Sequence, residues 1–358
     1  MVSELHLYLT ASNFILNKSP MRFLKELIAL LLVVLLILSC SKDKPIVSSS
    51  NYKSLPFNGA DLLNVFFLNS TQGYTAERNG VIRKTVDGGI SWSKLNTGTI
   101  LNITSVFFLN DSIGFAGGEF MTECITNDCN KSAILLKTRN GGTTWTKEFK
   151  PDIARFYGMY FFNEAVGIGI LMSMESKMVV ARTDNAGSTW NYLDLNITNS
   201  RFGNVEIIVK NTTCYILGDN RRIFKTKDRG INWDSLYTPV QSVNAGFVDE
   251  NTGFITDNSS IFKTSTGGFN WQKVNNNFSL FGKVHFSSEL NGIAIGYKMG
   301  YTGGDWPTAI SSRIYSTSDG GVTWTKKDDT EVISGIFSFP ADKVGYCFST
   351  NKIYILPR

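Results

Sequence analysis

Short apolar runs separated by turn residues recur along most of the chain. In the first such unit, residues 62–68 are apolar and residues 69–73 form a polar, glycine-containing turn. Three further short runs follow, at residues 74–76, 81–85 and 91–95, separated by Arg78-Asn79-Gly80 and Asp87-Gly88-Gly89. Runs of this length bounded by Gly, Asn and Asp are typical of strands joined by tight turns. The pattern predicts four strands per unit, here called A to D, that form one small antiparallel sheet.

Near the end of six units stands the phrase Lys-Thr-x-Asp-Gly-Gly-x-Thr-Trp or a close variant. Six copies occupy residues 84–92, 137–145, 182–190, 225–233, 263–271 and 316–324. The Asp can accept hydrogen bonds from N–H groups further round the turn, Gly supplies positive φ, and the Trp can cover the hairpin. We therefore assign structural rather than catalytic roles to the phrase residues Asp87, Trp92, Trp145, Trp190, Asp228, Trp233, Trp271, Asp319 and Trp324.

A second register, in strand A, has seven members. One position reads Phe67, Phe108, Phe161, Ile207, Phe247, Phe286 and Phe339, and the position two residues earlier reads Val65, Val106, Met159, Val205, Ala245, Val284 and Phe337. This period of two indicates one buried strand face. The intervening position is mixed and is expected to face elsewhere: Phe66, Phe107, Tyr160, Glu206, Gly246, His285 and Ser338.

The seventh unit, residues 334–356, has strands A to C before the chain ends. Its missing strand has a candidate near the N-terminus, because residues 52–55 (Tyr-Lys-Ser-Leu) resemble residues 92–95 (Trp-Ser-Lys-Leu). Pairing of these ends would close a ring and remove exposed sheet edges. The sequence therefore predicts an all-β fold, a single seven-bladed β-propeller over residues 51–358, closed by the N-terminal strand.

Residues 1–39 have the pattern of an export signal. A charged segment from Met21, expected to be the true start, precedes an apolar run at 27–38 and then Ser39-Cys40. Residues 36–40 resemble a bacterial lipoprotein signal, which implies that Cys40 is lipidated and that residues 40–50 form a tether. The expected location is the outer membrane, on its periplasmic or cell-surface side. An ordinary signal peptide with an incidental Cys is the alternative.

Charge and cysteine content narrow the classes of partner. The formal net charge of +5 is too small, for a chain of 358 residues, to indicate nucleic-acid binding. Cys124 and Cys129 are close in sequence, and an oxidising compartment favours a disulfide between them over a metal pair, which lacks further nearby ligands. Cys214 and Cys347 fall in strand B of units four and seven and are expected to be buried thiols.

Recognisable catalytic motifs are missing from the sequence. Beyond residue 39 the only histidine is His285, and no nucleophile elbow, phosphate-binding loop or dinucleotide fingerprint accompanies it. We expect neither a metal nor a cofactor. A glycoside hydrolase would need two carboxylates across a cleft, which spacing alone does not reveal, so that enzyme class remains the alternative.

The repeated phrase resembles the Asp-box, or bacterial neuraminidase repeat, with pattern Ser/Thr-x-Asp-x-Gly-x-Thr-Trp. Residues 85–92 and 317–324 match it best. Together with a preceding Phe-x-Asn-x-x-x-Gly-Tyr, as at 67–74, the phrase looks most like the photosystem II stability/assembly factor-like family. That resemblance implies a seven-bladed propeller that holds partner proteins without catalysis. Sialidases, the enzymatic rival, carry Arg-Ile-Pro, where this chain has only Arg313-Ile314-Tyr315.

The longest insertions all fall between strands B and C, at residues 117–132, 171–177 and 297–312. They would share one face of a propeller, and long loops on a rigid scaffold often carry function. The candidate binding residues are Phe120, Met121, Tyr301, Trp306, Arg78, Arg221 and Arg222. We expect a monomeric envelope lipoprotein that binds a partner protein or a glycan there. The bland alternatives are that Trp306 anchors its own loop and that the arginines are solvated turn residues.

Overall fold

The computed structural model describes the chain in segments. The described residues are 52–59, 61–120, 132–193, 195, 206–218, 221–241, 244–257, 259–275, 281–300, 308–330, 333–340, 344–349 and 351–357. The chain divides into two compact units, residues 1–49 and 50–358, and every described residue belongs to the second unit. All regular elements among the described residues are strands.

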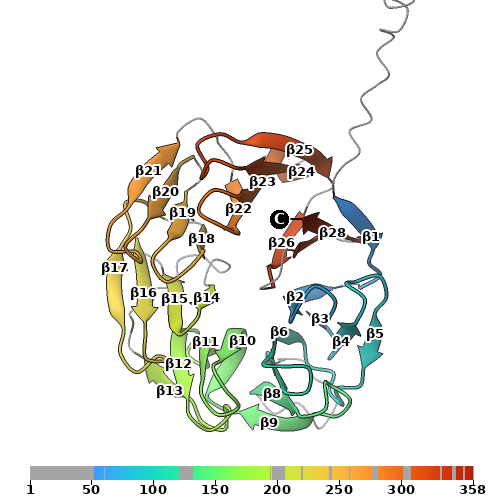
Figure 1. Ribbon diagram of the computed structural model, residues 1–358. Helices are drawn as coiled ribbons and strands as arrows, with labels where there is room; N and C mark the ends of the chain where they lie inside the picture. The colour runs from blue at the N-terminus through green and yellow to red at the C-terminus, as the bar shows by residue number, and fades with distance from the viewer. Residues whose placement is uncertain are drawn as a thin grey trace, which may run out of the picture. The chain divides into compact units, whose positions relative to one another are not determined.

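The described strands form seven four-stranded antiparallel sheets, the blades, arranged in a ring (Figure 1). Blade 1 contains β2 (Leu62–Phe67), β3 (Gly73–Glu77), β4 (Ile82–Thr85) and β5 (Ser93–Leu95). Blade 2 contains β6 (Ile103–Phe108), β7 (Gly114–Gly118), β8 (Ala133–Thr138) and β9 (Thr146–Lys150). Blade 3 contains β10 (Ile153–Phe161), β11 (Gly167–Ser173), β12 (Met178–Thr183) and β13 (Asn191–Leu193).

The remaining blades follow in chain order. Blade 4 contains β14 (Ile207–Lys210), β15 (Thr213–Gly218), β16 (Arg222–Thr226) and β17 (Asp234–Tyr237). Blade 5 contains β18 (Asn244–Phe247), β19 (Gly253–Thr256), β20 (Ile261–Thr264) and β21 (Gln272–Asn275). Blade 6 contains β22 (Phe281–Phe286), β23 (Gly292–Gly300), β24 (Thr308–Thr317) and β25 (Thr325–Thr330). Blade 7 contains β26 (Ile333–Ser338), β27 (Val344–Ser349), β28 (Lys352–Pro357) and β1 (Lys53–Pro56).

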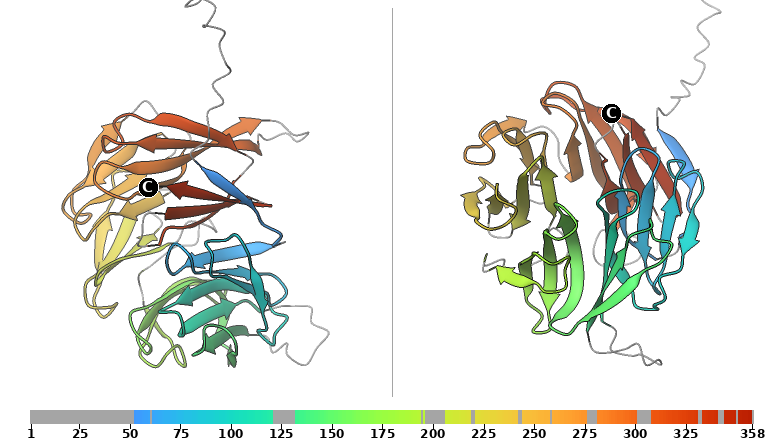
Figure 2. Two further views of the ribbon diagram at one scale, coloured as in Figure 1. Left: turned by 45° about the vertical axis from the view of Figure 1, so that its right-hand side comes forward. Right: turned by 60° about the horizontal axis from the view of Figure 1, so that its bottom comes forward.

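The two ends of the described chain meet in blade 7. Strand β1 pairs antiparallel with β28, with Lys53 opposite Ile355 and Leu55 opposite Ile353. Both views of Figure 2 show β1, in blue, beside the dark-red strands of the C-terminus. The predicted all-β, seven-bladed ring and its closure by the N-terminal strand are therefore confirmed.

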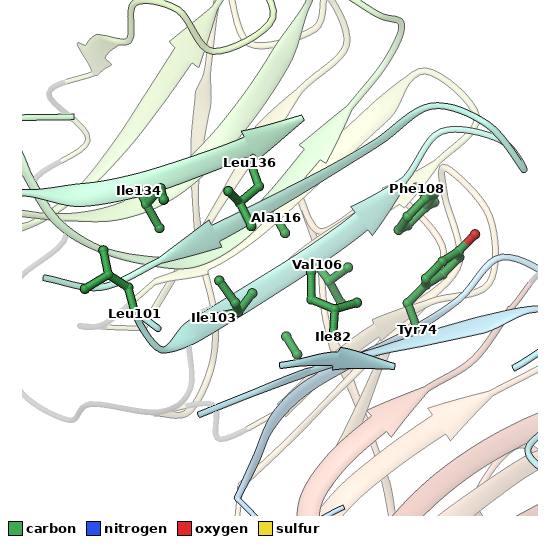
Figure 3. Packing of buried hydrophobic residues seen from close by; sticks show 10 residues of the cluster. Tyr74, Ile82, Leu101, Ile103, Val106, Phe108, Ala116, Ile134 and Leu136 are labelled. Carbon is green, nitrogen blue, oxygen red and sulfur yellow. The ribbon is translucent and has the colours of Figure 1, made fainter. Parts of the chain in front are cut away.

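Stacked aromatic rings join neighbouring blades. An aromatic residue near the start of strand B in one blade lies against the strand A phenylalanine of the next, as for Tyr74 and Phe108, whose ring centroids are 3.5 Å apart (Figure 3). The same contact occurs at 3.5–3.6 Å in Phe115–Phe161, Tyr215–Phe247, Phe254–Phe286 and Tyr346–Phe67. A stacked pair is worth about 0.5–1.5 kcal/mol beyond the apolar area it buries.

A glycine makes room for each of these phenylalanines. Phe67 lies over Gly73 at the start of strand B, and a Cβ atom on Gly73 would be 2.7 Å from the ring. The same arrangement recurs at Gly114, Gly167, Gly253, Gly292 and Gly345. No side chain larger than hydrogen fits there without moving the ring, so the Phe and Gly residues form a matched pair.

Unit four departs from this rule, and the predicted register there was wrong by two residues. The partner of Thr226 in strand B is Cys214, which is therefore the counterpart of Gly73, and Cys214 pairs with Val209 rather than with Ile207. The residue that corresponds to Phe67 is thus Val209. Because Cys214 has a side chain where the other blades have glycine, a phenylalanine ring does not fit above it and the smaller Val209 takes its place. The Phe that marks strand A in the other units is therefore missing from unit four.

The Asp-Gly-Gly turns are held by their own side chains. Asp87 Oδ1 accepts hydrogen bonds from Thr85 Oγ1 at 2.8 Å and from Ser91 N at 2.9 Å, while Ser91 Oγ donates to Oδ2 at 2.5 Å. The hydrogen bonds from Ser91, supported by Thr85, lower the pKa of Asp87 to about 2. Asn140 and Asn185 accept the same backbone bonds in blades 2 and 3.

The tryptophans cover the turns as expected, but with two kinds of bonding. In the three copies with Asp, the indole N–H of Trp92, Trp233 and Trp324 donates to the second glycine's carbonyl at 3.1 Å. In the copies with Asn or Thr, the buried indole N–H of Trp145, Trp190 and Trp271 has no hydrogen-bond partner among the described residues. Trp92 packs edge-on against Phe67, with centroids 6.0 Å apart.

The basic residue that opens the phrase bonds to the next blade, a role that sequence patterns did not suggest. Lys225 Nζ donates to the carbonyl of Gly267 at 3.1 Å, and Arg182 Nε donates to the carbonyl of Arg229 at 2.9 Å. Lys84 makes a longer version to Gly141 at 3.4 Å. These three phrases therefore stabilise both their own turns and the seams to the following blades.

The Phe–Gly rule predicts a rescue in blade 4. Val209→Phe alone should place a ring against the Cβ of Cys214 and lower the free energy of unfolding by about 1–3 kcal/mol, as overpacking does. The double variant Val209→Phe/Cys214→Gly should recover most of that loss, because it recreates the pair of the other six blades. Urea unfolding measures both, with Cys214→Gly alone as the control. A double variant no more stable than Val209→Phe would contradict the rule.

The lowered pKa of Asp87 predicts an acid-dependent contribution to stability. The folded pKa of about 2 lies below the unfolded value of about 3.9, so the stabilisation is complete above that value and is lost as pH falls toward 2. The difference in melting temperature between the wild type and Asp87→Ala should therefore shrink below about pH 4.

Asp87→Asn is the matched control, because Asn140 and Asn185 occupy this position in other blades. It should stay close to the wild type at neutral pH and carry none of this acid dependence. Thermal melts at a series of pH values make the comparison. A difference between wild type and Asp87→Ala that is constant from pH 7 to 2 would refute the assigned role of the carboxylate.

Candidate functional site

The two faces of the ring carry different connections. The Asp-Gly-Gly turns bond to the A–B turns beside them, as Gly88 N does to Thr71 O at 2.8 Å, and these form the uniform face. The B–C turns bond to the D–A connections, as Arg78 N does to Asp61 O at 3.2 Å and Thr238 N to Arg221 O at 2.9 Å. All three long insertions lie between strands B and C, so they share this second face, here called the insertion face.

The insertion of blade 2 leaves its own blade at once and crosses to blade 3. Phe120 N donates to Ala154 O at 2.9 Å, and Glu119 forms an ion pair with Arg155 at 3.0 Å. Asn102 Nδ2 also donates to Glu119 at 2.8 Å. These bonds hold the half-buried Phe120 over the seam between blades 2 and 3. The other predicted residues of this insertion, Met121, Cys124 and Cys129, lie outside the described residues.

The insertion of blade 3 is a strand extension rather than a free loop. Strand β11 runs to Ser173 and β12 begins at Met178, with Met172 opposite Met178. The short turn between them returns to the D–A connection, because Met174 N donates to Asp152 O at 3.3 Å. The Met174 side chain is 41% exposed at this turn.

The insertion of blade 6 is likewise β-paired at its base. Strands β23 and β24 continue to the pair Gly300 and Thr308, well past the ends of the corresponding strands in other blades. Tyr301 and Trp306 follow beyond that pair and lie outside the described residues.

The three predicted arginines do not form a cluster. Arg78 is exposed in blade 1, 3.9 Å from Asp61, whereas Arg221 and Arg222 belong to blade 4. Arg222 is held within its own blade: its guanidinium lies 4.4 Å from the centre of the Tyr237 ring and donates to the Tyr237 hydroxyl at 2.7 Å. Arg78 and Arg221 therefore remain the more available cations.

An apolar patch that sequence patterns missed surrounds the connection from blade 2 to blade 3. Met174 and Phe120 bond to the backbone of Asp152 and Ala154, and the Tyr192 hydroxyl donates to Asp152 O at 3.3 Å. Tyr192 is 46% exposed. Phe120, Met174 and Tyr192, here called the blade 2–3 patch, therefore converge on one segment. The contacts join residues 22 to 40 positions apart in sequence, and that of Phe120 joins two blades, so spacing along the chain did not reveal them.

A pocket of about 440 Å³ lies on the same face in blade 1. It is lined by Asn79, Gly80 and residues 94–100. Thr97 Oγ1 donates to Gly80 O at 2.6 Å and so ties the D–A connection to the B–C turn. Ile100, 45% exposed, extends the apolar surface toward blade 2.

Carboxylates near the insertion face are engaged in ion pairs. The buried Glu77 pairs with Arg83 at 3.1 Å, and Glu119 pairs with Arg155 at 3.0 Å. Toward the uniform face, Glu148 pairs with Lys137 and, at 2.8 Å, with Lys150, and both lysines also bond Ser188. Within the described segments, no three His, Cys, Asp or Glu side chains group as metal ligands would. The described part of the chain has no helix long and apolar enough to cross a membrane.

Both described cysteines are buried free thiols, as predicted. Cys214 and Cys347 form no disulfide, and burial raises the pKa of each thiol. Their strand B positions differ by two residues, since Gly345 rather than Cys347 is the counterpart of Cys214.

Comparison with known proteins places the fold among propellers. Neither a protein-family model nor a curated protein matches this sequence. Among solved structures, a YCF48 bound to D1 peptide is similar with a TM-score of 0.58 at 15% identity, over 86% of this chain and 97% of that chain. YCF48 from Cyanidioschyzon merolae is similar with the same TM-score and identity, over 85% of this chain and 98% of that one.

Other similar structures differ in function. The GH74 xyloglucanase from Xanthomonas campestris has a TM-score of 0.58 at 10% identity, and 85% of this chain matches 53% of that enzyme. The WD40 β-propeller domain of Doa1 has a TM-score of 0.52 at 13% identity, with 86% and 96% of the two chains covered. At such identities the similarity establishes the propeller fold alone.

Proposed function

We propose that this protein is a non-catalytic propeller that binds a partner protein through its insertion face. The observation that carries the proposal is the blade 2–3 patch, where Phe120 and Met174 from two B–C connections and Tyr192 from β13 bond to one segment. Aromatic and methionine side chains are enriched at protein interfaces, where they supply apolar contact area. Exposed Arg78 and Arg221 would lie at the polar rim of such an interface.

The rigid ring supports a binding role. The patch is held by bonds to the segment that leads into blade 3, and Glu119 pairs with Arg155 at 3.0 Å, so little order has to be imposed when a partner binds. The paired extension of β23 and β24, as far as Gly300 and Thr308, adds a second element on the same face. Similar propellers include YCF48, whose structure bound to D1 peptide gives a precedent for a polypeptide ligand.

A glycoside hydrolase on this face is the competing function. Such an enzyme needs one carboxylic acid with a raised pKa opposite a second carboxylate. Among the described carboxylates of the insertion face, Glu77 and Glu119 each form an ion pair with an arginine. This pairing supports the binding function over the hydrolase.

Site-specific photocrosslinking in envelope extract tests the binding face. A crosslinking amino acid in place of Met174 should capture one discrete partner, whereas the same residue in place of Ile90, 61% exposed on the uniform face, should capture none. Tyr192→Ala and Met174→Glu should each weaken binding of the purified partner at least tenfold, as loss of an anchor residue does.

The matched control is Val322→Ala, a change of an exposed apolar residue on the uniform face, which should leave the affinity unchanged. Trp306→Ala and Tyr301→Ala report whether residues 301–306 contribute to partner binding. Crosslinks from position 90 but not from position 174 would show that the partner binds the uniform face, which contradicts the proposal. Turnover of aryl glycosides or sialosides that survives in Val322→Ala and is lost in Glu119→Gln would favour the hydrolase instead.

The proposed location is the outer membrane, with Cys40 as the lipidated first residue of the mature chain. The support is the sequence at residues 36–40 together with the compact unit that begins at residue 50. Cys40→Ala should release soluble protein or leave an unprocessed precursor, as cell fractionation and mass spectrometry would show. A processed Cys40→Ala chain that stays attached to the membrane would refute lipidation, and Cys40→Ser provides a second, independent variant.

A further inference from the structure

Closure of the ring leaves a gap in the uniform face at blade 7. In the six other blades, strands C and D are joined by an Asp-Gly-Gly or related turn, whose second glycine packs on the preceding blade. Gly268, for example, packs toward Leu236 of blade 4, and Gly321 packs toward Ile261 of blade 5. In blade 7 the fourth strand is β1, from the other end of the chain, so no such turn lies over blade 6.

Blade 6 has a sequence change that matches this gap. Its phrase begins with Ser316, whereas the five earlier copies begin with Lys or Arg. Four of those basic side chains donate to the Asp-Gly-Gly-type turn of the next blade, as Lys225 does to Gly267 O. Lys263 pairs instead with Glu289 of the next blade. A lysine at 316 would have no such turn to bond, and the serine leaves its space empty.

The result is a pocket of about 380 Å³ on the blade 6 side of the seam, within the range of about 300–1,000 Å³ that is usual for small-molecule sites. Tyr52 forms one wall. Pairing of β1 places it where Trp92 stands in blade 1, and it is buried against Ile293 and Ile314. The pocket's floor and rim come from β22 to β25 of blade 6 and their turns.

The lining is almost entirely neutral and rich in hydroxyl groups. It includes the side chains of Ser287, Ser316, Thr317, Ser318, Thr323 and Thr325, with Asn291 and His285 beside them. The His285 ring is fixed by stacking on Phe339, with centroids 3.7 Å apart and planes within 2°. Hydroxyl and amide groups can both donate and accept hydrogen bonds, and Lys327 is the one lining residue with a formal charge.

We propose that this pocket binds a neutral sugar ring, such as one unit of an envelope glycan. A sugar presents several hydroxyls that match a lining of mixed donors and acceptors, and it has apolar C–H faces that can lie on an aromatic wall such as Tyr52. A strongly charged ligand would find only Lys327 as a counter-charge. The site lies on the uniform face and does not depend on the partner-binding function proposed for the insertion face.

Saturation-transfer NMR with the propeller, residues 40–358, and a panel of neutral monosaccharides and disaccharides tests this site. The panel comprises glucose, galactose, mannose, N-acetylglucosamine, maltose and cellobiose. At least one sugar should bind with a Kd of about 1 mM or tighter, which corresponds to about −4 kcal/mol. Ser316→Lys fills the pocket with the residue type found in other blades. It should raise the Kd for that sugar at least tenfold.

Asn291→Ala is a second variant in the lining and should raise the Kd for the same sugar, so the test does not depend on one substitution. Val322→Ala, on the adjoining turn but outside the lining, should leave binding within twofold of the wild type. Thermal melts establish that each variant is folded.

Three results would overturn the proposal. The first is the absence of binding by every sugar of the panel up to 50 mM (about fifty times the expected Kd). The second is sugar binding that Ser316→Lys and Asn291→Ala leave unchanged. The third is sugar binding only after residues 40–50 are deleted, which would show that the chain's own tether fills the pocket.

Discussion

The contact between a strand A phenylalanine, the glycine beneath it and an aromatic ring of the preceding blade is the constraint on which the ring depends. Phe108 lies over Gly114 of its own blade and stacks on Tyr74 of the blade before, so one side chain joins two sheets. Five seams have such a stack at 3.5–3.6 Å among the described residues. At about 0.5–1.5 kcal/mol each, their sum is comparable with the net stability of a domain, about 5–15 kcal/mol.

This constraint explains why the fold could be predicted from sequence. Phe and Gly recur at fixed spacing because each blade needs both, and the count of seven strand A registers against six phrases predicted closure by residues 52–55. The prediction was wrong in blade 4, where both members of the pair differ. Val209 replaces the phenylalanine and Cys214 replaces the glycine, so a smaller side chain packs over a larger one. A pattern search for Phe finds no signal there, although the physical requirement is unchanged.

The candidate site was less predictable for a related reason. The positions of the insertions follow from the sequence, since extra residues between strands B and C must emerge on one face. Their conformations depend on contacts between blades, such as the bond from Phe120 N to Ala154 O and the pairing of Glu119 with Arg155. Those partners are more than thirty residues apart, and no local pattern of polarity marks them. The roles of Lys225 and Arg182 were missed for the same reason, because each acts on the next blade's turn.

The seam between blades 6 and 7 shows what closure of a ring by two chain ends requires. Its strand B residue is Ile293 instead of an aromatic, and Phe339 stacks instead on His285 from strand A of blade 6. The last blade has no turn for a basic residue to bind, and Ser316 replaces that residue. The seam therefore has neither the usual stack nor the usual bond between turns, and β1 with Tyr52 compensates through backbone pairing and burial. The repeat is least regular where the chain ends meet, and space for a ligand opens at that point.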